Sequence, residues 1–146
     1  MLIKSGFLWG FIMSELVQIE KSDKKGYWRA VEFESWTSAF ITYCDEFDIK
    51  NISRCERHRT TDEVFCLLEG CAYLIISGDG EAPNEKAEII TLEKGVMYNV
   101  KKDVWHQIVV SCDASVLIVE NSADHKTERL PLSKQTIDYV KNIVRF

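Results

Sequence analysis

The chain has 146 residues, a length typical of one domain with a sizeable core. Hydrophobic residues make up 46% and charged residues 28% of it, which is ordinary for a globular protein. The formal net charge of −5 argues against generic nucleic-acid binding, because phosphates need a basic face. The 5 cysteines form no Cys-x-x-Cys pair, so we predict no disulfide framework or zinc knuckle and expect a reducing, cytoplasmic setting.

The chain begins with an apolar amino-terminal stretch. Residues 6–13 read GFLWGFIM, which is far too short to span a bilayer, and no small-x-small cleavage site follows. We therefore expect no membrane association. Two alternatives stay open for residues 1–13. They form an extension upstream of Met13, or they form an edge strand swapped between subunits.

Short segments rich in aromatic and β-branched residues then alternate with turn residues. Glu69-Gly70 predicts a bend, and GDGEAPNEKA at 78–87 is the clearest turn signal. The predicted strands cover residues 27–33, 36–43, 49–58, 64–68, 71–77, 88–92, 96–100, 104–111 and 114–120. Eight or nine strands at this spacing indicate an antiparallel sandwich or barrel. We assign residues 14–125 to it.

The end of the chain, residues 126–146, predicts a helix packed on the barrel. Ser133 is a suitable N-cap, and apolar residues recur on one helical face afterwards. Residues 122–129 are expected to be a charged linker that leads into this helix.

The predicted strand at 104–111 is apolar on both faces and carries a histidine on one of them. His106 shares a face with Ile108 and Val110, whereas Trp105 and Val109 point to the other side. The strand should therefore be covered on both sides, as in a small barrel whose wall is packed against another element.

Two patterns of chemically active residues stand out. Residues 56–70 read ERHRTTDEVFCLLEG, with Glu56-x-His58, then Glu63, then six residues to Gly70. Residues 95–110 place Gly95 ahead of His106. These patterns resemble the two motifs of the cupin superfamily, over about residues 50–121.

The resemblance has specific departures. The first motif of the family has histidine where this chain has Glu56. In the second motif, Lys101 replaces a proline, Asp103 a glycine and Val110 an asparagine. The resemblance implies an all-β fold, a cupin-type double-stranded β-helix (jelly-roll) barrel with a C-terminal α-helix.

The resemblance also implies a site. His58, Glu63, His106 and Glu56 occupy the positions that usually hold a divalent metal, such as Mn, Fe, Ni or Zn, and such ligand types suit these ions. Glu56 and Glu63 are the candidate catalytic carboxylates. Glu56 is a fourth ligand, a general base, or a solvated charge that has turned outward.

Other polar side chains are candidates for binding a substrate at the mouth of the barrel: Arg54, Tyr73 and Tyr98. An inward-pointing arginine would suit a carboxylate or phosphate, although Arg54 is also placed to balance a nearby glutamate.

We expect a small polar metabolite as ligand and a metal-dependent isomerase, lyase or dioxygenase as the activity. The alternative is a cupin without metal that binds a small molecule or serves in dimerisation. Outward apolar residues such as Val64, Cys66 and Leu68 need cover, so we expect a homodimer.

Overall fold

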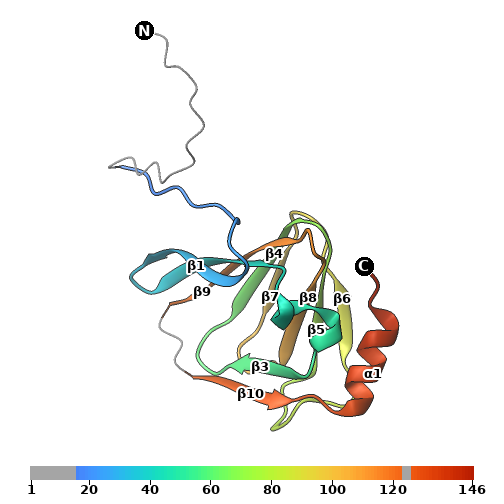
Figure 1. Ribbon diagram of the computed structural model, residues 1–146. Coiled ribbons are helices and arrows are strands. Elements are labelled where there is room, and N and C mark those ends of the chain that lie inside the picture. Colours follow the sequence, from blue (N-terminus) through green and yellow to red (C-terminus); the bar gives the residue numbers. More distant parts are fainter. Residues whose placement is uncertain (1–15, 123–125) are drawn as a thin grey trace.

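Ten strands form two antiparallel sheets that face each other in the computed structural model, which describes residues 16–122 and 126–146 (Figure 1). The first sheet has the order β1 (Gly26–Phe33), β2 (Trp36–Thr42), β9 (Ser115–Asn121), β4 (Glu63–Glu69) and β7 (Met97–Val100). The second has the order β10 (Thr127–Pro131), β3 (Arg54–His58), β8 (His106–Val110), β5 (Ala72–Ile76) and β6 (Glu88–Thr91).

The chain crosses from one sheet to the other at nearly every connection after β3. Only β5 and β6 are consecutive strands of the same sheet in this part of the chain. This is the connectivity of a jelly-roll barrel. The predicted fold class is therefore confirmed, and the two histidines of the motifs come from neighbouring strands, β3 and β8.

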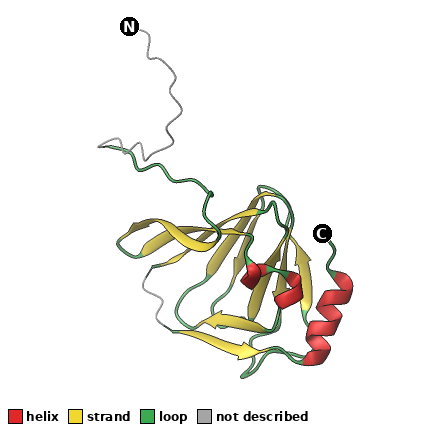
Figure 2. Cartoon of the chain, in the orientation of Figure 1, coloured by secondary structure: helices red, strands yellow, loops and turns green. Residues whose placement is uncertain are grey.

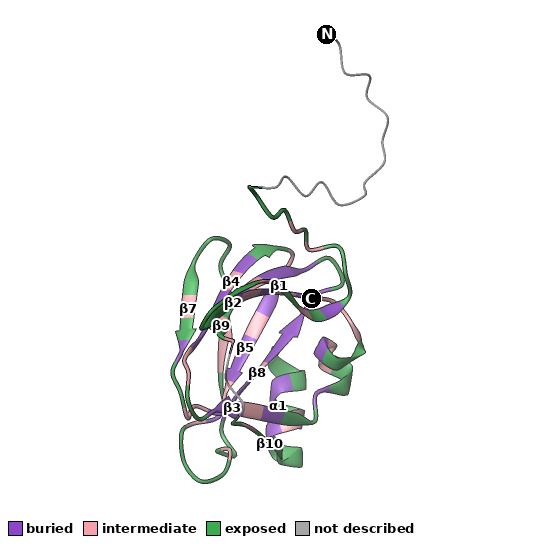
Figure 3. Ribbon diagram, turned by 90° about the vertical axis from the view of Figure 1, so that its left-hand side faces the viewer, coloured by how far each residue is buried: buried purple, intermediate pink, exposed green. Residues whose placement is uncertain are grey.

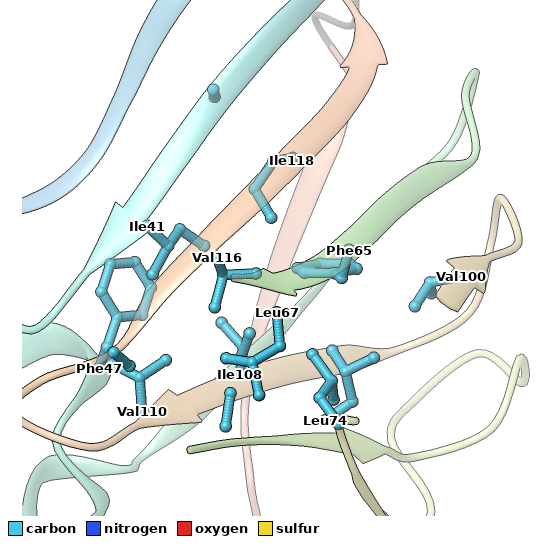
Figure 4. Close-up of a cluster of buried hydrophobic side chains, with 14 residues drawn as sticks. Ile41, Phe47, Phe65, Leu67, Leu74, Val100, Ile108, Val110, Val116 and Ile118 are labelled. Atoms are coloured by element: carbon cyan, nitrogen blue, oxygen red, sulfur yellow. The ribbon is translucent and has the colours of Figure 1, made fainter. Parts of the chain in front are cut away.

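The interior of the barrel is an apolar core shared by both sheets. Its side chains include Phe65 and Leu67 from β4, Ile108 from β8, and Val116 and Ile118 from β9 (Figure 4). Each is at most 3% exposed, so the inner faces of the two sheets are in close contact. Purple buried segments alternate with exposed ones along the strands in Figure 3.

A second core lies on the outer face of the second sheet. Trp105 and Val109 pack there with Val140 of α1 (Lys134–Ile143), the longest red helix, which ends near the C marker (Figure 2). The prediction that the two faces of β8 are both covered is confirmed. The Ser133 side chain accepts a hydrogen bond from the backbone N–H of Thr136, which confirms the predicted N-cap.

Two local predictions were wrong. Residues 49–51 form a short 3-10 helix, where Asp48 caps the turn by accepting from the N–H of Lys50. Residues 127–131 form strand β10 rather than a linker, because they pair with all of β3. The segment was hard to recognise because it is charged and ends at a proline, which is tolerated at the edge of a sheet. Across the described residues, no helix combines the length and apolar character needed to cross a membrane.

Candidate functional site

A polar pocket of about 230 Å³ lies between the sheets at one end of the barrel. Its lining side chains come from β1, β2, β3, β4, β8, β9, β10 and the turn at Asp45–Phe47. Four of them are glutamates, three are arginines and two are histidines. Charged side chains of both signs therefore converge on a small space, which is the character of a site for a small polar ligand.

His58, Glu63 and His106 meet at the buried end of this pocket. The Oε2 atom of Glu63 lies 3.1 Å from His58 Nε2 and 2.9 Å from His106 Nε2. All three residues are at most 7% exposed. The structure thus brings together three of the side chains that the motifs single out, although they come from three strands.

The second nitrogen of each imidazole is held by a neighbour. His106 Nδ1 lies 2.9 Å from the backbone oxygen of Val104, and His58 Nδ1 lies 3.0 Å from Thr127 Oγ1. A carbonyl oxygen only accepts, so His106 Nδ1 carries a proton. In the neutral ring the lone pair of Nε2 then points at Glu63, as in metal-binding histidines.

This orientation leaves two acceptors facing each other. The carboxylate of Glu63 is also an acceptor, so a cation between Nε2 and Oε2 would satisfy both atoms. Two imidazoles and a carboxylate are a chemically suitable donor set for a divalent metal. The residues present therefore fit such an ion.

Glu63 is an acid held in its ionised form. Burial alone would raise the pKa of this carboxyl, but the hydrogen bonds and charges of His106 and His58 outweigh burial and lower it to about 2. A buried carboxylate is stable only when it is paired in this way.

Glu56 lies at the pocket but is already paired. Its backbone is directly opposite His106 between β3 and β8, and its Oε2 lies 2.8 Å from Nη2 of Arg129 on β10. One atom from each of Glu56, His58 and His106 lies within 4.8 Å of the others. Glu56 has therefore not turned away from the site, but the guanidinium of Arg129 already pairs with its carboxylate.

Arg54 is at the rim of the same pocket. It is half exposed and its Nη2 lies 2.9 Å from Oε1 of Glu46, rather than pairing with Glu56 or Glu63. The two predicted tyrosines lie elsewhere. Tyr73 donates to the backbone oxygen of Arg145 beside the C-terminal helix, and Tyr98 accepts from the N–H of Glu93. Neither tyrosine lines the pocket, so this placement gives no support to a role in binding there.

The pocket residues that the sequence analysis missed include Glu120 and Tyr27. Glu120 on β9 is directly opposite Glu63 on β4, and Tyr27 of β1 donates to Glu120 Oε1 at 2.5 Å. Burial raises the pKa of the Glu120 carboxyl, an effect that the hydrogen bond from Tyr27 opposes. The available signal was parity, because Glu120 follows Val116 and Ile118 on the buried face of the strand.

In the second motif, Asp103 replaces a glycine but adopts a backbone conformation that glycine favours. Asp103 has a φ of 69°, in the left-handed region that glycine adopts without strain. Its N–H donates to the backbone oxygen of His58 at 2.8 Å. The turn before β8 therefore holds the end of β3, and the substitution by aspartate leaves this connection in place.

Comparisons with known proteins are consistent with the fold. No family model matches the sequence, and neither does a curated protein. Among solved structures, a cupin-2 domain protein of Shewanella frigidimarina is 20% identical over 73% of this chain and 86% of its own, with a TM-score of 0.48.

Two further structures have TM-scores above 0.5. A Streptomyces Pac13 variant with uridine is 5% identical over 74% of this chain and 78% of its own, with a TM-score of 0.54. A hydroquinone 1,2-dioxygenase of Sphingomonas with bound 4-hydroxybenzoate is 11% identical over 69% of each chain, with a TM-score of 0.51. The jelly-roll barrel, with the two motif histidines on the neighbouring strands β3 and β8, gives this chain a cupin fold.

Proposed function

We propose that this chain is a metal-dependent cupin enzyme that acts on a small polar metabolite. The observation that carries the proposal is the convergence of His58 Nε2, His106 Nε2 and Glu63 Oε2, with separations of 3.1 and 2.9 Å from the carboxylate oxygen. These three residues would hold a divalent ion. Such an ion acts as a Lewis acid that polarises a carbonyl or hydroxyl oxygen of the substrate.

The surrounding residues supply binding rather than reaction steps. Arg54 and Arg129 lie at the pocket, and each is paired with a glutamate that an anionic group on a ligand would have to replace. Isomerase, lyase and dioxygenase activities are the reaction types that we expect. The fold neighbours include a protein described as a nucleoside dehydratase and a hydroquinone dioxygenase, which supports enzymes of this class.

A second candidate is a cupin that binds a small molecule without metal. The ion pair between Glu56 and Arg129 favours it, because the position that is histidine in the family motif is here neutralised within the protein. In this case, a hydrogen bond between His106 Nε2 and Glu63 Oε2, 2.9 Å apart, would take the place of the metal.

Metal analysis separates the two candidates. The protein is purified without a metal-binding tag, and its metal content is measured by mass spectrometry for wild type, His106→Ala and His106→Gln. Glu88→Gln, an exposed change on β6, serves as the control. We expect stoichiometric metal in wild type and in the control, and its loss in both His106 variants.

Thermal unfolding provides an independent measurement. A metal that binds only the folded protein raises the melting temperature by mass action. The metal-dependent function is wrong if the wild type holds no metal and if Mn²⁺, Fe²⁺, Ni²⁺ and Zn²⁺ leave its melting temperature unchanged. A screen of metabolites by the same measurement then identifies the ligand class.

A further inference from the structure

A second carboxylate faces the candidate metal centre from outside the positions that the cupin motifs specify. Glu120 lies on β9, and the strand register places it directly opposite Glu63 on β4. One atom from each of His58, Glu63 and Glu120 lies within 4.8 Å of the others. The two glutamates therefore project from neighbouring strands of one sheet towards the same histidine.

This pairing is costly without a cation. Like charges directly opposite each other on adjacent strands destabilise a sheet, and the cost grows when the pair is removed from water. Glu63 is 5% exposed, and Glu120 is half-buried. The hydroxyl of Tyr27 satisfies one oxygen of Glu120 but is neutral. The positive charges of His58 and Arg29 oppose the repulsion between the two glutamates.

The two candidates for a second carboxylate ligand differ in their partners. Glu56 Oε2 is paired with Arg129 Nη2 at 2.8 Å, so a metal would compete with this arginine for the carboxylate. Glu120 Oε1 accepts from a phenol, and Oε2 has no hydrogen-bond partner among the described residues. A hydrogen bond from a neutral donor is also what orients ligating carboxylates in metal sites.

We propose that Glu120, oriented by Tyr27, is the second carboxylate ligand of the divalent metal, and that Glu56 is not a ligand. This inference rests on the proposed function. The resulting donor set joins His58, Glu63 and Glu120, which each have one atom within 4.8 Å of the others, with His106, whose Nε2 lies 2.9 Å from Glu63 Oε2. Two carboxylates and two imidazoles favour a harder divalent ion such as Mn²⁺ over an ion that prefers thiolates.

The test measures Mn²⁺ binding by titration calorimetry, with the metal alone as probe. The variants are Glu120→Gln and Glu56→Gln, which remove the same charge from the two competing positions, together with Tyr27→Phe and His106→Ala. We expect Glu120→Gln to weaken Mn²⁺ binding most, and Tyr27→Phe to weaken it by about tenfold, as for a residue that orients a ligand. Glu56→Gln should weaken it by less than about tenfold, because Glu56 is here neither a ligand nor the partner of one.

Melting temperatures without metal show whether each variant folds, and Tyr27→Phe keeps the test informative if Glu120→Gln does not. The inference is overturned if Glu56→Gln weakens binding tenfold while Glu120→Gln and Tyr27→Phe bind as wild type does. In that case, loss of binding in His106→Ala would still support the proposed function. Failure of the wild type to bind any divalent metal would overturn both.

Discussion

Gly70, the glycine that ends the first motif, occupies a position that only glycine fits. Its φ is 70°, and a Cβ built on it would lie 2.6 Å from the Cα and 2.7 Å from the backbone nitrogen of Ala114. Gly95, in the second motif, has a φ of 77° but nothing within 4 Å of such a Cβ. A side chain at either glycine would strain the backbone, but only at Gly70 would it also collide with neighbouring atoms.

We expect Gly70→Ala to lower the free energy of unfolding by roughly 2–4 kcal/mol, because strain and overpacking add. Gly95→Ala should lower it by about 1 kcal/mol, the cost of the left-handed conformation alone. Urea denaturation of both variants measures the difference. Equal losses would contradict the packing of Ala114 against this turn.

At the scale of single elements, Arg57 joins three segments of the chain. Its Nε donates to Glu128 Oε2 on β10, its Nη1 donates to the backbone oxygen of Gly80, and its guanidinium lies 4.3 Å from the ring centre of Trp105. Its side chain is 6% exposed. Arg59, two residues further on, is 40% exposed and pairs with Asp103.

These two arginines give a matched pair of substitutions. We expect Arg57→Met to cost about 2–3 kcal/mol of unfolding free energy, because its buried hydrogen bonds are lost and Glu128 loses its closest partner. Arg59→Met should cost less than about 1 kcal/mol, as exposed ion pairs contribute little. Calorimetric unfolding of both variants checks this. A larger loss for Arg59→Met would mean that β10 is not held by Arg57.

The elements show what the sequence can and cannot predict. The strands that carry alternating apolar residues, and the capped C-terminal helix, follow from local periodicity and were predicted close to their observed bounds. Strand β10 was missed because its pairing with β3 is decided by contacts some 71 residues apart, such as that between Arg57 and Glu128. The motif histidines and Glu63 were identified from their pattern, whereas Glu120 and Tyr27 belong to no motif and reach the pocket only through sheet register.

At the scale of the whole molecule, the two sheets differ in how their outer faces are covered. Helix α1 covers the second sheet. On the first sheet the strand register aligns one apolar row across all five strands, in the order Trp28, Phe40, Leu117, Cys66 and Met97. Met97, at the end of this row, is 77% exposed, and Val119, two residues from Leu117 on β9, is 38% exposed.

Such a continuous apolar face on a monomer is unusual and marks an interaction surface. We expect a second copy of this chain to cover it, because a two-fold axis lets the same row serve both subunits. Multi-angle light scattering at micromolar concentration should then show a dimer for wild type and a monomer for Val119→Lys, which places a charge within the face. Tyr139→Lys, on a 40% exposed position of α1, is the control and should stay dimeric. A monomeric wild type would show that no such dimer forms. A Val119→Lys variant that remains dimeric would show that the dimer contact lies on another face.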